Sequence, residues 1–380
     1  MRICSHAFLC ACAVVLASKA VSAQPQATRV PNARAPNASD GALLSACGSG
    51  TEAMHEIART VALRSLRGAP SWSMVELGQR LREQGEPHPG ARAWTLKAPE
   101  VDRVQALQRL QGWLGSHPER VPRRCGVASV TDSERGEAIA VVAVPVLADL
   151  SQSMGAIVVP GRWVTVDVLV YNQATAGSVV VLGPRGAPRT IPSSFDPDSG
   201  RVLGRFMADR EGPWFVQVVA TTAAGPKPVI ELQLHAGDKK AESSSGAPGE
   251  EAGQGLSDEQ AVVAMLNAAR EREGLRPLLR DAKADEVARE HVKRMIAQGI
   301  VAHDAGDGSP PERAARAGIS SSEVGENVSR AASTKLVHRA LWNSPSHRAN
   351  TLHPRYERVG VGAVRDERGV LWVAQLFVGR

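Results

Sequence analysis

The sequence of 380 residues has no apolar run long enough to cross a bilayer and no block of like charges. A membrane-spanning helix needs about 20 consecutive apolar residues. The apolar run near the start, Phe8 to Leu16, is less than half that length. Lysine and arginine are interspersed with aspartate and glutamate, and the formal net charge is only +6. The charge pattern typical of nucleic-acid binders is missing, so we expect neither a nucleic-acid partner nor a transmembrane segment.

The first 23 residues instead have the pattern of a secretory signal peptide. Arg2 supplies positive charge, the short apolar run follows, and Val21-Ser22-Ala23 is a small-residue cleavage pattern. We therefore expect export to a periplasm, the cell surface or the extracellular space, with cleavage after Ala23. Removal of Arg2 and Lys19 with this segment leaves a net charge of +4.

Cysteine is scarce as well. Three of the five cysteines lie within the signal segment, so the mature chain keeps only Cys47 and Cys125. In an oxidising compartment we expect these two to form a disulfide, the alternative being two buried thiols. Such a bridge typically stabilises a protein by about 2 to 4 kcal/mol.

The chain is too long for one ordinary core, and its composition predicts a multidomain protein. Residues 24–40 are rich in proline, alanine and asparagine without periodicity, which indicates a disordered tether. Residues 41–125 repeat apolar positions at helical spacing and are predicted to be helical. Short valine-rich runs separated by turn clusters over residues 126–236 predict an antiparallel β-sandwich. Residues 237–256 have the Ser, Gly and charged composition of a flexible linker.

The last unit, residues 257–380, mixes helices and strands. Ser257 and Gln260 occupy capping-box positions at the start of a first helix. A second helix is predicted from about Ala282 to Gln298, and two strands are predicted over residues 359–364 and 370–378. An α+β fold follows from this order of elements.

Short motifs follow one another through this unit in a specific order. They are Leu266-Asn267 with Arg270, Gly274-Leu275, His291 with Met295, His303, Gly325-Glu326-Asn327, Trp342, Ser344-Pro345-Ser346-His347-Arg348, and Val359-Gly360-Val361-Gly362. In this order they resemble the CAP superfamily, named for cysteine-rich secretory proteins, antigen 5 and plant pathogenesis-related proteins, in the form that bacteria export. The resemblance covers about the last third of the chain.

This resemblance implies an α-β-α sandwich with a cleft lined by two histidines and acidic residues. In several relatives that cleft holds a divalent cation such as zinc. Carried over position by position, the histidines are His303 and His347, which become the candidate metal ligands, and the first acid is Glu326. The larger family places a second glutamate three residues after the tryptophan, where this chain has Pro345.

The residues themselves allow three interpretations of this site. Two neutral imidazoles and a carboxylate can hold zinc and leave a fourth position for an activated water. Without a metal, Glu326 beside an imidazolium offers acid or base chemistry. A hydrogen-bonded polar cluster that only fixes the surrounding loops is the structural alternative. His291, on an apolar helix face, is predicted to be a satisfied core residue.

The sequence favours a binding module over an enzyme and assigns no catalytic residue. We expect a secreted CAP-domain protein whose cleft, formed by His303, Glu326 and His347, binds a small hydrophobic or envelope ligand and a divalent metal. One alternative is a metal-assisted hydrolase, such as a peptidase, that uses the same three residues. Another is a structural adhesin built on the β-sandwich, for which the last unit would be dispensable.

Overall fold

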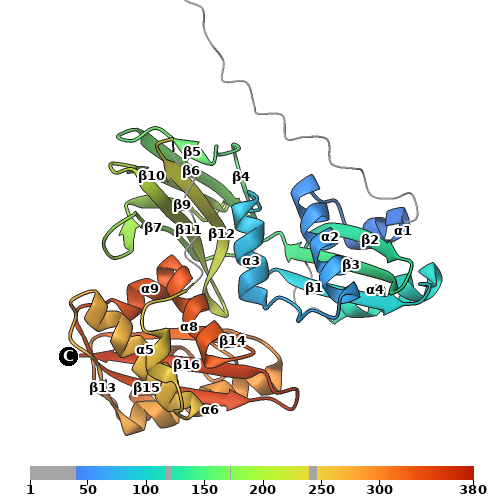
Figure 1. Cartoon of the computed structure of the whole chain (residues 1–380). Helices are drawn as coiled ribbons and strands as arrows, with labels where there is room; N and C mark the ends of the chain where they lie inside the picture. The colour runs from blue at the N-terminus through green and yellow to red at the C-terminus, as the bar shows by residue number, and fades with distance from the viewer. Residues whose placement is uncertain (1–39, 117–120, 172, 239–245) are drawn as a thin grey trace, which may run out of the picture. The chain divides into compact units, whose positions relative to one another are not determined.

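The computed structural model describes residues 40–116, 121–171, 173–238 and 246–380 (Figure 1). The predicted signal peptide, its three cysteines and nearly all of the predicted tether lie outside these residues. Within the four described stretches, no helix combines the length and the apolar composition that a membrane span requires.

Residues 40–146 form three layers around a small antiparallel sheet with the strand order β1-β3-β2 (Figure 1). The central strand β3 is buried along nearly its whole length, because helices cover both faces of the sheet. Alternate residues of β3 pack against α2 and α3 on one face and against α1 and α4 on the other. The elements are α1 (Gly41–Cys47), α2 (Glu52–Leu66), α3 (Met74–Glu83), β1 (Arg92–Ala98), α4 (Arg103–Gly115), β2 (Arg123–Asp132) and β3 (Gly136–Pro145).

The prediction of a purely helical segment over residues 41–125 differs from this structure. Strand β1 lies inside the segment, and β2 and β3 belong to its sheet, whereas the sequence analysis assigned residues 126–146 to the sandwich. The apolar run of β3 identifies a buried strand but not the sheet that it joins. Cys47 at the end of α1 and Cys125 in β2 form a disulfide with a Cα–Cα distance of 5.9 Å.

Residues 147–236 form two sheets that share one core of valine, leucine and isoleucine side chains. The strand orders are β4-β6-β10-β9 and β5-β12-β11-β7-β8, and all pairs are antiparallel except β5 with β12. The core lies between the two sheets because inward residues alternate with outward ones, most regularly in β10. The strands are β4 (Ala148–Leu150), β5 (Ile157–Val158), β6 (Trp163–Val170), β7 (Ala176–Leu182), β8 (Arg189–Ile191), β9 (Ser193–Asp196), β10 (Arg201–Met207), β11 (Gly212–Thr222) and β12 (Gly225–Ala236).

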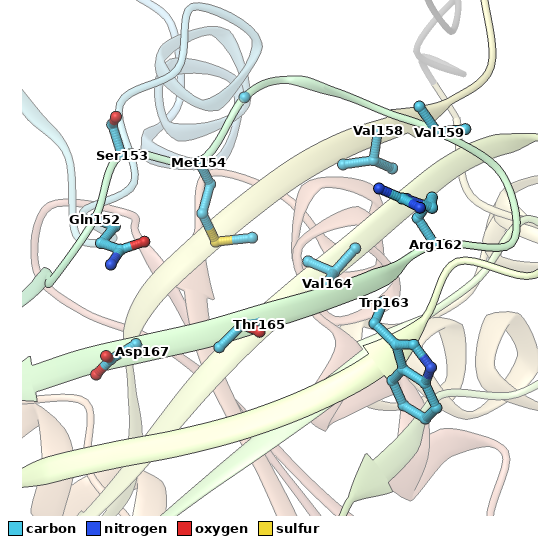
Figure 2. A pocket seen from close by; sticks show the side chains of 11 residues that line it. Gln152, Ser153, Met154, Val158, Val159, Arg162, Trp163, Val164, Thr165 and Asp167 are labelled. Carbon is cyan, nitrogen blue, oxygen red and sulfur yellow. The ribbon is translucent and has the colours of Figure 1, made fainter. Parts of the chain in front are cut away.

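A hollow of about 610 Å³ lies on this two-sheet part, between β6 and the loop that precedes it (Figure 2). Met154 reaches from the loop toward the strand that carries Thr165 and Asp167 (Figure 2). The carboxylate of Asp167 is paired with Arg201 at 2.6 Å. The hollow holds none of the residues singled out in the sequence.

Residues 247–380 build a three-layer α-β-α unit (Figure 1). Its mixed sheet has the order β13-β15-β16-β14, and every residue of β16 is buried. Helices α5 and α8 cover one face of the sheet, and α6 and α7 cover the other. The elements are η2 (Glu250–Gly253), α5 (Asp258–Arg272), β13 (Leu279–Arg280), α6 (Ala282–Gln298), α7 (Pro310–Arg316), β14 (Val324–Ala331), α8 (Thr334–Asn343), α9 (Pro345–Thr351), β15 (Tyr356–Arg365) and β16 (Leu371–Gly379).

Two glycines explain how closely α6 approaches the sheet. A Cβ atom on Gly360 would lie 2.0 Å from the backbone of Ala284, and one on Gly362 would lie 2.4 Å from the backbone nitrogen of Arg289. No side chain can be accommodated at such distances. The Val-Gly-Val-Gly motif of β15 thus has a packing role.

The prediction of a flexible linker over residues 237–256 holds for none of its described second half. Ala247 is buried in a small cluster with Trp342 and Leu352. Glu250 accepts hydrogen bonds from Arg339, and this partner, with the Ala247 amide, lowers its pKa to about 2 against the opposing effect of burial. Glycine and serine composition predicted flexibility, but these contacts anchor the segment to α8. Residues 239–245 lie outside the described part.

Candidate ligand site

The centre of the site is the carboxylate of Glu326 on strand β14, whose side chain is almost completely buried. Its Oε2 atom lies 2.8 Å from Nδ1 of His303, in the loop between α6 and α7. Its Oε1 atom accepts a hydrogen bond from Nη2 of Arg313 on α7. Both oxygens of the glutamate therefore have close partners inside the protein. Because a carboxylate only accepts, His303 carries its proton on Nδ1.

The sequence analysis missed Arg313. Its side chain is 5% exposed, and it also donates to the backbone oxygen of His303 at 2.7 Å. It compensates the buried charge of Glu326 and fixes the loop that carries the histidine. The capping box formed by Ser309 and Glu312 signals a helix start at this point in the sequence. No sequence pattern, however, says that an arginine of that helix faces a strand residue.

His291 on α6 lies beneath this centre and is fully buried. Its Nδ1 atom is 2.8 Å from the carboxylate of Asp307, and its Nε2 atom is 2.9 Å from the backbone oxygen of Ala302. Both partners are acceptors, so the ring donates from both nitrogens and is an imidazolium. The Nε2 atom is also 3.7 Å from Oε2 of Glu326. His291 is thus a satisfied core residue that adds positive charge near the glutamate.

His347 on the short helix α9 does not contact Glu326 directly. Its Nδ1 atom lies 2.8 Å from the hydroxyl oxygen of Ser344. Burial, reinforced by the positive charge of nearby His303, lowers the pKa of His347 to about 3. The ring is consequently neutral throughout the physiological range.

Two asparagines hold α9 against β14. Asn327 donates to the backbone oxygen of His347 at 3.1 Å and to the side chain of Gln375. Asn350 donates to the backbone oxygen of Glu326 at 2.9 Å and to Asn327. The Gly-Glu-Asn motif and the helix that carries His347 are therefore one hydrogen-bonded unit. Tertiary contact alone assembles it, because its two segments are about 20 residues apart in the chain.

Glycine is needed at the first position of that motif. A Cβ atom on Gly325 would lie 2.1 Å from the hydroxyl of Tyr356. The tyrosine ring stacks on Phe377 in the core, with a centroid separation of 5.2 Å, and so cannot move away. The start of β14, and with it the position of Glu326, depends on this close approach.

A second hollow of this unit lies apart from these residues. It has a volume of about 310 Å³ and is lined by residues of the segment before β14 and of the start of β15, among them Glu323, His353 and Tyr356. None of the three predicted site residues lines it.

The residues present fall short of a complete set of zinc ligands. Both oxygens of Glu326 and the Nδ1 atoms of both histidines already have partners, which leaves the two Nε2 atoms. A protein zinc site needs three or four ligands. Pro345 replaces the second acid and occupies the first turn of α9, a position that suits proline. Among the described residues, no group of three His, Cys, Asp or Glu side chains is arranged to hold a metal.

The layers, the order of the motifs and the Glu326 centre together define the class of this unit. It is a CAP domain: residues 263–377 match the model of the Cysteine-rich secretory protein family.

The particular relatives are bacterial. The chain is 36% identical over 124 residues to the uncharacterized protein YkwD of Bacillus subtilis (strain 168), a match that covers 32% of this chain and 47% of that protein. The match thus spans about half the length of this curated relative.

Solved structures show similarity as well. An extracellular protein containing a SCP domain from Bacillus anthracis is 18% identical, with 60% of this chain and 69% of that chain covered and a TM-score of 0.30. An outer surface protein from Borrelia burgdorferi is 20% identical, with 32% of this chain and 92% of that chain covered and a TM-score of 0.31.

Proposed function

We propose that this chain is an exported bacterial protein whose CAP domain binds a small ligand at His303 and His347. The observation that carries the proposal is the state of the two imidazoles. Each has its Nδ1 atom fixed by a protein group, Glu326 for His303 and Ser344 for His347. Within the described residues, neither Nε2 atom has a hydrogen-bond partner. A cluster that served only to fix loops would pair these atoms too.

The electrostatics of the centre suit binding. Arg313 and His291 balance the charge of Glu326, so His303 is oriented by a carboxylate without being overwhelmed by its negative charge. The side chain of His303 is 15% exposed and remains reachable from solvent. An oriented imidazole of this kind can hold a polar group of a ligand whose remainder is apolar, as in a small hydrophobic or envelope molecule.

Export is supported by three independent features. The N-terminal residues have the signal-peptide pattern. Cys47 and Cys125 form a disulfide, which persists in oxidising compartments. One structural relative is described as extracellular. A periplasmic, cell-surface or extracellular location is compatible with all three.

A hydrolase is the second candidate, and the contact between Glu326 and His303 favours it. A carboxylate that fixes the Nδ1–H tautomer of a histidine leaves Nε2 free to act as a general base. A metal-assisted version would need ligands beyond the two histidines. The adhesin alternative assigns the same cluster no role at all.

The test is a binding experiment on the full chain with ¹³C-labelled histidine. We expect a panel of phospholipids, sterols and cell-wall fragments to contain a member that shifts the ring signals of His303 and His347. The His303→Ala variant should lose that binding. His353→Ala is the matched control, because it removes a histidine of the same domain outside the site, and binding should persist.

Absence of any ring shift across the panel would contradict the binding proposal. Turnover of a peptide substrate that disappears in His303→Ala would instead establish the hydrolase. Surface attachment that survives deletion of residues 257–380 would support the adhesin.

A further inference from the structure

Gln217 reaches the site from strand β11, outside the CAP domain. It is completely buried, although its side chain is polar. Its Oε1 atom accepts a hydrogen bond from the backbone nitrogen of Ser346 at 2.9 Å. Its Nε2 atom is 2.8 Å from Glu231 Oε1 and 3.0 Å from the hydroxyl oxygen of Ser344. One buried amide therefore has hydrogen-bond partners in both regions of the chain.

These partners determine which end of the amide is which. A backbone N–H can only donate, so the atom facing Ser346 must be the amide oxygen. A carboxylate only accepts, and Glu231 is ionised because it is paired with Arg82 at 2.5 Å. The nitrogen end of Gln217 thus faces Glu231 and Ser344, and it donates one proton to each.

The hydroxyl of Ser344 consequently receives a hydrogen bond from Gln217 and has one proton of its own to donate. Two acceptors are within reach: Nδ1 of His347 at 2.8 Å and the hydroxyl of Ser346 at 3.4 Å. The shorter contact is the stronger hydrogen bond. Nδ1 of His347 is then an acceptor, and the proton of this neutral ring lies on Nε2.

His303 has the opposite arrangement. Its Nδ1 donates to Glu326, so the Nε2 atom of the neutral ring carries a lone pair. Asn327 and Asn350 hold the helix of His347 beside Glu326, so the two imidazoles belong to one unit.

We propose that Gln217 holds His347 in the Nε2–H tautomer, so that the two histidines offer one donor and one acceptor to a hydroxyl group of the ligand. A hydroxyl accepts and donates at once, which matches this pair. A metal ion needs a lone pair on both nitrogens and does not match it. The inference rests on the proposed function and names its ligand class. Gln217 is a positioning residue, since it acts through Ser344.

A second contact ties the same region to the loop of His303. The backbone nitrogen of Asp304 donates to the oxygen of Ala224 at 3.3 Å, in the turn between β11 and β12. A Cβ atom on Gly225 would lie 2.8 Å from the Cβ atom of His303. Gly225 also has a φ of +95°, so a side chain is excluded there on two grounds. Both histidines are thereby positioned in part by residues of β11, β12 and their turn.

The tautomers can be measured without any ligand, by ¹⁵N NMR of the full chain with labelled histidine. We expect His347 as the Nε2–H form and His303 as the Nδ1–H form. The Gln217→Leu variant removes the donor to Ser344 and should raise the Nδ1–H population of His347. Gln233→Leu makes the same substitution on β12 and should change neither ring. A wild-type His347 in the Nδ1–H form, or an unchanged tautomer in a folded Gln217→Leu variant, would overturn the inference.

The ligand class is tested with 1-octanol, methyl octyl ether and Zn²⁺ as probes. The ether can accept but not donate, so wild-type protein should bind it about two- to tenfold more weakly than the alcohol, the loss of one hydrogen bond. Gln217→Leu should reduce this difference and bind Zn²⁺ more tightly by a similar factor. Equal affinity for alcohol and ether in wild-type protein would refute the hydroxyl assignment. Failure of all three probes and of the lipid panel would refute the proposed function, while the NMR result would still decide the tautomers.

Discussion

Acid should weaken the CAP domain through His347. The folded structure lowers the pKa of this imidazole to about 3, mainly by burial, whereas an unfolded chain has the ordinary value of about 6.5. Between these two values the unfolded state binds more protons than the folded state. The contribution of a neutral, buried His347 is therefore complete above pH 6.5 and is lost as the pH falls toward 3. At pH 5 the loss is about 2 kcal/mol.

The matched variant is His347→Asn, whose side-chain amide can still reach Ser344 but does not titrate near neutral pH. Hydrogen exchange of the β14–β16 amides, corrected for the intrinsic rate at each pH, measures the free energy of opening of this sheet. From pH 8 to pH 5 we expect that free energy to fall by about 2 kcal/mol more in wild-type protein than in the variant, or roughly 30-fold in the opening constant.

The other titrating groups are common to both proteins and cancel in this comparison. Among them are His338 and His353, whose pKa values burial also lowers. Identical pH dependence of wild-type and variant protein would show that His347 is protonated in the folded state without cost, and the argument from its burial would be wrong.

Two further predictions concern stability. Replacing Arg313 by leucine leaves the buried carboxylate of Glu326 without its cation, and we expect a loss of about 3 to 5 kcal/mol in urea unfolding, part of which Glu326→Gln in the same chain should restore; an unchanged midpoint would show that the ion pair is not needed. Replacing Cys47 and Cys125 by serine should lower the free energy of unfolding by about 2 to 4 kcal/mol, since a loop of 78 residues is no longer closed; equal stability of the reduced and oxidised protein would contradict this.

Local patterns were a good guide wherever one segment decides its own structure. The capping box of Ser257 and Gln260 does begin α5, as the sequence predicted. The second helix has the predicted bounds of residues 282–298. Helical periodicity and cap chemistry act over a few residues, so they can be recognised without knowledge of the rest of the chain.

Composition was a poor guide wherever distant contacts decide. The Gly- and Ser-rich segment before α5 was predicted to be flexible, but Glu250 and Ala247 anchor its described half to α8. Strand β3 was assigned to the sandwich because its apolar run is compatible with any buried sheet. In both cases the deciding partner lies many residues away.

The ordered motifs of the last third determined its family and named the chemistry-bearing side chains His303, Glu326 and His347, because residue type and order are properties of the chain itself. Only the tertiary structure decided what those side chains can do. Arg313 and Gln217 come from other elements, and no local pattern indicates that they face the site. They occupy the carboxylate and direct the proton of Ser344, and hydrogen-bond direction depends on which atoms meet in space.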